Sequence, residues 1–188
     1  MLLITEDVTM FLEILFLGRG GQGAVTAGRI LAEAALREGR YVQTFPEFGP
    51  ERSGAPVRAY VRISDEPIEI RAPVETVDIA GVFEKRLLDS QNILPMIKDG
   101  GLLVVGSGQP LGIKSPGVKV FTVDARQIIE SLGRPRSLNL AIIGALASAS
   151  GIVSVDVLRE IVASRFGEKD AEVVVAASRS VRREGENA

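Results

Sequence analysis

The chain has 188 residues, of which 46% are hydrophobic and 24% are charged, and its formal net charge is -2. This length suits one domain, and the composition is typical of a well-packed soluble protein without a strongly basic surface for nucleic acid. The sequence contains neither cysteine nor histidine. It therefore excludes disulfides, cysteine-ligated zinc, cysteinyl iron–sulfur clusters and a Ser-His-Asp triad. Asp, Glu, Lys or Tyr could still catalyse, but a complete active site within this chain is disfavoured, and we predict no catalytic and no metal-binding residue.

The N-terminal stretch MLLITEDVTMFLEILFLG does not resemble a signal peptide. It has no basic start, and Glu6, Asp7 and Glu13 interrupt its apolar residues. No apolar run reaches the length of about 18 residues that a membrane helix needs. We therefore expect a cytoplasmic protein that does not enter a membrane.

Apolar periodicity and turn residues predict the elements of the chain. In chain order these are strand 12–17, helix 24–38, strand 41–45, loop 46–56, strand 57–63 and a returning strand 68–71 that completes a hairpin. They continue with strand 77–83, helix 85–97, strands 102–106 and 118–123, and helices 125–132, 138–150, 155–166 (capped by Ser154) and 169–183.

The alternation of strands and helices predicts an α/β fold. We expect a mostly parallel, doubly wound, Rossmann-like sheet with an inserted β-hairpin and a helical C-terminal region. Residues 12–184 would form a single domain, and residues 1–11 an N-terminal extension.

The stretch GRGGQG lies between the first strand and the first helix. Gly18, Gly20 and Gly23 match the pattern G-x-G-x-x-G, in which glycines let the backbone approach a phosphate. The first amides of the following helix then point at the anion, aided by the helix dipole. This pattern predicts a phosphate-binding turn.

Other parts of a nucleotide signature are missing. Where a dinucleotide fold places an acidic residue for the ribose, the sequence reads VQTF, and the turn lacks the Lys-Ser/Thr pair of a P-loop. An NAD site is therefore disfavoured. Two interpretations stay open: the turn binds phosphate or pyrophosphate, or its glycines only pack the helix on the strand. Gln22 likewise either donates to an anion or a partner, or faces solvent.

The segment FPEFGPERSGAP, which starts at Phe45, is the second unusual stretch. It follows the second strand, at the end where α/β proteins bind ligands. Arg52 could bind a phosphate or carboxylate through two hydrogen bonds, or it could pair with Glu47 or Glu51. Exposed Phe45 and Phe48 would form an apolar patch. We therefore expect this loop at a subunit interface, and weak self-association of the isolated chain.

A third candidate is the segment GRPRSLNLAIIGALA. Arg134 and Arg136 precede the helix that starts near Leu138, Ser137 is its predicted N-cap, and Asn139 lies in its first turn. Two arginines beside a helix N-terminus suit an anion or an acidic partner. Alternatively, they are solvated charges.

The segments GRGGQG, FPEFGPERSGAPVRAYVRI and NLAIIGALA together resemble the gamma subunit of 2-oxoacid:ferredoxin oxidoreductases, of the pyruvate and branched-chain 2-oxoacid type. The resemblance covers residues 12–184. These enzymes decarboxylate a 2-oxoacid on thiamine diphosphate, pass electrons through iron–sulfur clusters to ferredoxin, and transfer the acyl group to coenzyme A. In the multi-subunit forms the thiamine and cluster sites lie on other chains, which fits a chain without cysteine or histidine.

The resemblance implies partners of the alpha, beta and delta type, with ferredoxin reached indirectly and no nucleic acid bound. Thiamine diphosphate and the clusters would lie on those partners, and the isolated chain would be inactive. Coenzyme A is the implied ligand, with its pyrophosphate at the glycine turn. The residues expected to contact it are Arg19, Gly20, Gly21, Gln22, Gly23 and Arg52. The alternative is a free-standing α/β protein that binds a nucleotide or phosphate.

Overall fold

The computed structural model describes residues 9–48, 54–113 and 115–185. Within them the chain forms a 7-stranded sheet of order β2-β3-β1-β4-β5-β6-β7. Its strands are β1 (Phe11–Arg19), β2 (Tyr41–Phe48), β3 (Pro56–Ser64), β4 (Val77–Val82), β5 (Ile97–Gly106), β6 (Lys119–Val123) and β7 (Arg182–Arg183). The helices are α1 (Ala24–Arg37), α2 (Lys85–Gln91), α3 (Ala125–Ser131), α4 (Leu138–Ser150), α5 (Val155–Phe166) and α6 (Glu168–Ser180).

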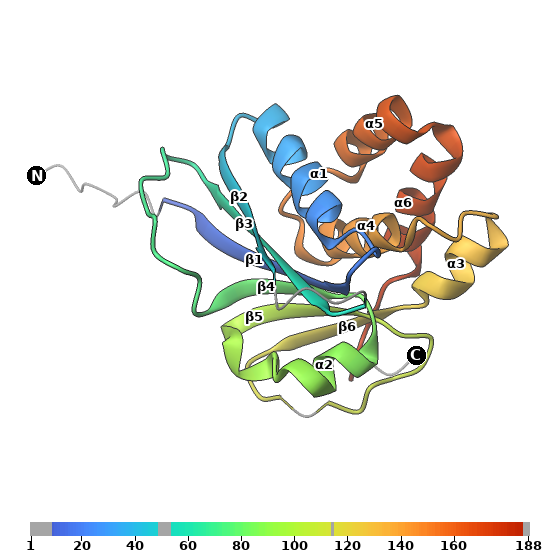
Figure 1. Cartoon of the computed structure of the whole chain (residues 1–188), viewed down its shortest axis with the longest axis horizontal. Helices are drawn as coiled ribbons and strands as arrows, with labels where there is room; N and C mark the ends of the chain where they lie inside the picture. The colour runs from blue at the N-terminus through green and yellow to red at the C-terminus, as the bar shows by residue number, and fades with distance from the viewer. Residues whose placement is uncertain (1–8, 49–53, 114, 186–188) are drawn as a thin grey trace, which may run out of the picture.

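The sheet is mixed, and helices cover both of its faces. β1, β4, β5 and β6 pair in parallel, whereas β3 runs antiparallel to β1 and β2, and β7 runs antiparallel to β6. Figure 1 shows α2 on one face, and α1 with α3 to α6 on the other. The predicted doubly wound α/β fold with a helical C-terminal region is confirmed.

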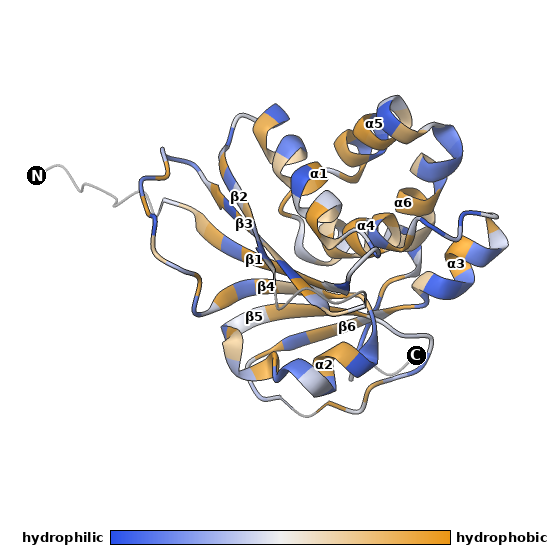
Figure 2. Ribbon diagram, viewed as in Figure 1, coloured by the Kyte–Doolittle hydropathy of each residue, from blue (hydrophilic) through white to orange (hydrophobic). Residues whose placement is uncertain are grey.

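Strand β1 lies at the centre of this arrangement. Ile14 and Phe16 face the large helical layer, and Leu15 and Leu17 face α2, and all four side chains are fully buried. Burial on both faces explains why the strand is a continuous apolar run rather than an alternating one. Figure 2 shows the same contrast between apolar inner strands and hydrophilic outer helix surfaces.

The crossing of α4 and α6 depends on a glycine. A Cβ at Gly144 would lie 2.3 Å from the carbonyl oxygen of Val174. Only a residue without a side chain therefore permits this close contact between the two helices. The contact holds the N-terminal end of α4 at the carboxyl edge of the sheet, beside the start of α1 (Figure 1).

The predicted strand Ile68–Arg71 is wrong. The segment lies beside β3 but forms no ladder, because its carbonyls bind a side chain instead. The guanidinium of Arg62 donates to the carbonyl oxygens of Ile70 at 3.1 Å and of Ala72 at 2.6 Å. The hairpin of this fold is made by β2 and β3, which pair antiparallel along their whole length.

Several predicted boundaries also differ. The strand predicted from Leu102 already begins at Ile97. Pro46–Phe48 belongs to β2 and not to a loop. The helix from Lys85 ends at Gln91, where Asn92 takes a left-handed conformation (φ +48°), and Leu94–Met96 follow as a short 3-10 helix. The last helix ends at Ser180, and Arg182–Arg183 then extends along β6. None of the helices formed by the described residues is long and apolar enough to span a membrane.

Candidate functional site

The glycine turn connects the end of β1 to the start of α1. Gly21 and Gly23 have φ angles of +90° and +87°, a region that residues with a side chain rarely adopt. Gly23 is the N-cap of α1. The N–H of Gln22 closes the turn by donating to the carbonyl oxygen of Arg19 at 3.0 Å. Two of the glycines are therefore required by the backbone itself.

Some main-chain N–H groups of the glycine turn already donate to carbonyl oxygens of the chain. The N–H of Gly20 donates to the carbonyl oxygen of Ala55 at 2.9 Å, and the N–H of Gln22 is used as described above. The amides of Gly21 and Gly23 make no hydrogen bond with other described residues. A Cβ at Gly21 would also meet nothing within 4 Å. Of the predicted donors, these two amides are the ones left for a ligand.

The polar side chains of the turn point to Glu84, at the end of β4. The Gln22 side-chain amide donates to the Glu84 carboxylate, and its oxygen accepts from the N–H of Arg19 at 2.7 Å. Arg19 Nε lies 3.9 Å from Glu84 Oε2, and Arg126 donates to the same carboxylate at 3.0 Å. The side chain of Gln22 therefore braces the turn, and the charge of Arg19 is offset within the fold.

The structure describes only part of the second candidate segment, residues 45–56. Arg52 lies outside the described residues, as does the rest of segment 49–53 and the side chain of Phe48. Phe45 is half-buried, and its ring stacks on Tyr60 with centroids 5.6 Å apart. The prediction that Phe45 is an exposed aromatic is therefore wrong, because the partner ring on β3 covers it.

The residues before α4 are held by a buried carboxylate. Ser137 is the N-cap, as predicted, but its hydroxyl donates to Asp170 on α6 instead of capping the helix. Asp170 is 4% exposed and also accepts from both Nε (3.1 Å) and Nη2 of Arg134. This pairing fixes the turn that carries both arginines of the third candidate segment.

Asn139 brings the glycine turn and α4 together. It is 7% exposed, and its side-chain amide makes no hydrogen bond among the described residues. A Cβ at Gly23 would lie 2.8 Å from Asn139 Nδ2. Two segments that the sequence presents as separate candidates therefore form one site. No local pattern indicates this contact, because it depends on how α4 crosses the sheet.

A cavity of about 290 Å³ lies between the N-terminal ends of α1 and α4. The residues of its wall that bear on binding are Gly21, Gly23, Arg134, Arg136, Asn139 and Phe166. Arg134 is paired with Asp170, whereas Arg136 is exposed and has no partner in the described part of the chain. Helix N-termini favour anions, and two of them converge here with a free positive charge. The arrangement is suited to a phosphate group.

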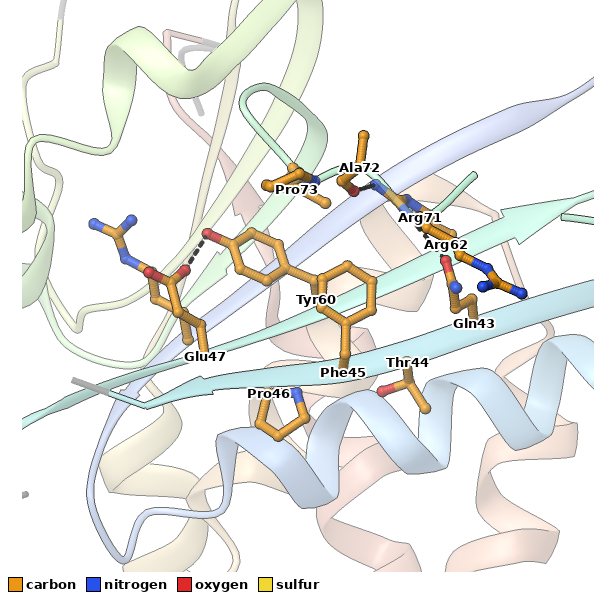
Figure 3. Close-up of a pocket in the computed structure, with 12 residues that line it drawn as sticks. Gln43, Thr44, Phe45, Pro46, Glu47, Tyr60, Arg62, Arg71, Ala72 and Pro73 are labelled. Atoms are coloured by element: carbon orange, nitrogen blue, oxygen red, sulfur yellow. Dashed lines mark hydrogen bonds between the residues drawn. The ribbon is translucent and has the colours of Figure 1, made fainter. Parts of the chain in front are cut away.

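Two larger cavities differ from this one. A cavity of about 580 Å³ lies at the carboxyl ends of β5 and β6. Another, of about 600 Å³, lies on the face of β2 and β3 that is turned away from α1 (Figure 3), where Arg62 binds the main chain and Tyr60 donates to Glu47 at 3.0 Å. Burial raises the pKa of Tyr60, and the neighbouring Glu47 raises it further.

The described residues contain no cluster of three or more acidic side chains that could hold a metal ion.

The chain is a doubly wound α/β domain with a small cavity, lined in part by Arg134 and Arg136, at the carboxyl edge of its sheet. The chain belongs to the pyruvate ferredoxin/flavodoxin oxidoreductase family, whose model matches residues 13–185.

Curated relatives are similar to this chain over most of their length. The common gamma subunit of pyruvate/ketoisovalerate oxidoreductases from Thermococcus kodakarensis is 45% identical over 171 residues, which cover 85% of this chain and 91% of that protein. The pyruvate synthase subunit PorC of Methanothermobacter marburgensis is 41% identical over 179 residues, or 93% of this chain and 99% of that protein.

Solved structures share the fold. The pyruvate oxidoreductase subunit PORC of Thermotoga maritima has a TM-score of 0.81 and 31% identity, covering 93% of this chain and 98% of that one. A 2-oxoglutarate:ferredoxin oxidoreductase from Magnetococcus marinus, with 2-oxoglutarate, coenzyme A and succinyl-CoA bound, has a TM-score of 0.74 and 27% identity. The match covers 90% of this chain and 30% of that one.

Proposed function

We propose that this chain is the gamma subunit of a multi-subunit 2-oxoacid:ferredoxin oxidoreductase that acts on pyruvate or a branched-chain 2-oxoacid. The observation that carries the proposal is the family match over residues 13–185, together with gamma-subunit relatives that align along nearly their whole length. The chain supports oxidative decarboxylation to an acyl-CoA through assembly with its partners and through contact with coenzyme A.

The absence of cysteine and histidine supports a division of labour. Thiamine diphosphate and the iron–sulfur clusters belong to alpha, beta and delta-type subunits, and electrons pass from them to ferredoxin. Isolation of the native complex tests this assignment. The chain should co-purify with partners that carry thiamine diphosphate and clusters, whereas the chain alone should not oxidise 2-oxoacids with an artificial acceptor. A chain that purifies without partners would favour the free-standing nucleotide-binding alternative.

Coenzyme A binds, in this proposal, with its pyrophosphate at the glycine turn. The free amides of Gly21 and Gly23 are the main-chain donors that support it, and Arg52 is the predicted side-chain contact. A charge-assisted hydrogen bond of this kind contributes about 1.5–3 kcal/mol. Arg52→Ala should therefore raise the Michaelis constant for coenzyme A in the reconstituted complex by roughly 10- to 100-fold.

Gly21→Val tests the main-chain contact. A side chain at this position would point into open space and block the approach of the ligand, at the cost of a strained backbone. Gly39→Val is the matched control. Gly39 also has a positive φ (+83°) and open space around it, but it follows the C-terminal end of α1.

The Michaelis constant for coenzyme A should rise in Gly21→Val and stay unchanged in Gly39→Val, with decarboxylation spared in both. An unchanged constant in both Gly21→Val and Arg52→Ala would show that the glycines serve only to pack α1 on β1.

A further inference from the structure

We propose that the cavity at the carboxyl ends of β5 and β6 binds an α-amino acid with an aliphatic side chain. Its volume of about 580 Å³ falls within the range of ligand pockets, about 300–1,000 Å³. The described residues that line it are all different from those that line the cavity between α1 and α4. The proposal therefore goes beyond the proposed function and does not depend on the contact with coenzyme A.

Thr122, on β6, carries a buried hydroxyl without a partner. It is 8% exposed, it lines the cavity, and its side chain forms no hydrogen bond with another described residue. Buried polar groups in proteins are almost always hydrogen-bonded, and leaving one without a partner costs stability. An oxygen atom of a ligand in the cavity would accept a hydrogen bond from this hydroxyl.

Arg182 lies directly opposite Thr122 in the ladder between β6 and β7. Side chains of such a pair lie on the same face of the sheet, with their Cβ atoms about 4.5–5.5 Å apart. Arg182 lines the same cavity, is exposed, and forms no ion pair with a described residue. A guanidinium binds a carboxylate through two parallel hydrogen bonds, and the hydroxyl can donate a third. This pair of residues is suited to a carboxylate.

Asp124 supplies the opposite charge, directly after β6. Its Oδ1 accepts from the N–H of Gln127 at 3.1 Å, whereas its Oδ2 binds no other described residue. A Cβ at Gly108 would lie 2.3 Å from Oδ2, so a glycine at this position leaves space around the oxygen. Two residues of a strand span about 6.6 Å, so the carboxylate lies a short distance from Thr122.

The two charges of this cavity do not neutralise each other. Arg182 and Asp124 both line it, yet they form no ion pair. A small molecule that carries an anion and a cation would bind both without breaking a bond within the chain. The ammonium and the carboxylate of an α-amino acid have this arrangement of charge.

The apolar part of the wall indicates an aliphatic side chain. Pro110 and Ile128 both line the cavity, and Ile128 is 9% exposed. The loop that carries Pro110 is held in place, because the N–H of Leu111 donates to the carboxylate of Glu184. The N–H of Glu184 donates in turn to the carbonyl oxygen of Val120 on β6, at 2.8 Å. The wall is therefore fixed to the sheet before a ligand binds.

Calorimetric titration of the full chain tests the proposal with L-leucine and two analogues. 4-Methylpentanoate lacks the ammonium of leucine, and 3-methylbutylamine lacks its carboxylate. Because each analogue loses a charge-assisted hydrogen bond, leucine should bind more tightly than either, by roughly 10- to 100-fold. Equal affinity for leucine and 4-methylpentanoate would overturn the assignment of an amino acid, and this comparison needs no variant.

Three variants test the individual contacts. Arg182→Gln should weaken leucine by roughly 10- to 100-fold, and Thr122→Val by about 2- to 10-fold. Asp124→Asn keeps the cap of α3, because Asn caps a helix as well as Asp does. It should abolish the preference for leucine over 4-methylpentanoate. Arg179→Gln is the matched control, since Arg179 is exposed on α6 and does not line the cavity. Circular dichroism confirms that each variant is folded.

The outcomes separate a binding site from an empty cleft. Leucine that binds neither the full chain nor the reconstituted complex overturns the proposal, and so does equal affinity for leucine in Arg182→Gln and Arg179→Gln. A preference for leucine over 4-methylpentanoate that survives in Asp124→Asn overturns the role of Asp124. Loss of that preference in Asp124→Asn but not in Arg179→Gln supports the site.

Discussion

The cavity on the face of β2 and β3 turned away from α1 and the cavity between α1 and α4 differ in what their polar groups bind. The first is about twice as large, at about 600 Å³ against about 290 Å³. Its buried cation, Arg62, is 1% exposed and donates to Glu13, Gln43 and two main-chain carbonyls. The second holds an amide, that of Asn139, and a cation, Arg136, that bind no other described residue.

Because of this difference we expect a ligand at the cavity whose donors are unused rather than at the larger one. A donor that already binds its own chain must break that bond before it binds a ligand, and the gain is small. In the larger cavity the polar groups stabilise the hairpin and the segment that follows it (Figure 3). In the smaller cavity Asn139 and Arg136 have no partner among the described residues, so a ligand can bind them without breaking a bond within the chain.

The largest expected effect concerns Arg62. Arg62→Leu removes a buried cation and leaves Glu13 and two carbonyls without their donor, which should lower the free energy of unfolding by about 3–5 kcal/mol. Urea denaturation measures this. Arg71→Leu, at an exposed arginine of the same cavity, should change stability by less than about 0.5 kcal/mol. Similar losses in the two variants would contradict a structural role specific to Arg62.

A smaller effect is expected at Asp170. Asp170→Asn keeps the shape but removes the charge that binds Arg134 and Ser137, so stability should fall by about 1–3 kcal/mol. The freed turn lies beside the glycine turn, so the Michaelis constant for coenzyme A in the reconstituted complex should also rise. Glu172→Gln, at an exposed acidic residue of the same helix, is the control. Loss of stability with an unchanged Michaelis constant for coenzyme A would show that Asp170 supports the fold but not the binding of coenzyme A.

The smallest effect concerns the pH dependence of Tyr60. Its pKa is raised above the ordinary value of about 10 by burial, so the folded chain keeps this proton longer than the unfolded chain does. The stabilisation is complete below about pH 10 and is lost as the pH rises above that value. Urea midpoints at alkaline pH should show this loss in Tyr41→Phe, where Tyr60 is intact, and not in Tyr60→Phe. Identical alkaline profiles in the two variants would exclude it.

The sequence by itself determined most of the individual strands and helices, and it excluded several kinds of functional site. Apolar periodicity and glycine positions predicted the strand, turn and helix from residue 12 to residue 38, because these patterns express contacts between near neighbours in the chain. The lack of cysteine and histidine excluded whole classes of site before any fold was known. The sequence also singled out residues beside the N-terminus of a helix, namely Arg134, Arg136 and Asn139. It did not indicate which other helix or turn they would contact.

Only the tertiary structure decided which of these pieces meet. Gly144 lets α4 approach α6, and this crossing brings Asn139 against Gly23. Arg62 recruits the carbonyls of Ile70 and Ala72, so a segment with strand-like composition forms no strand. In each case the deciding contact joins residues far apart in the chain, or a side chain to a main chain. Such contacts depend on the packing of the whole domain, and no local pattern encodes them.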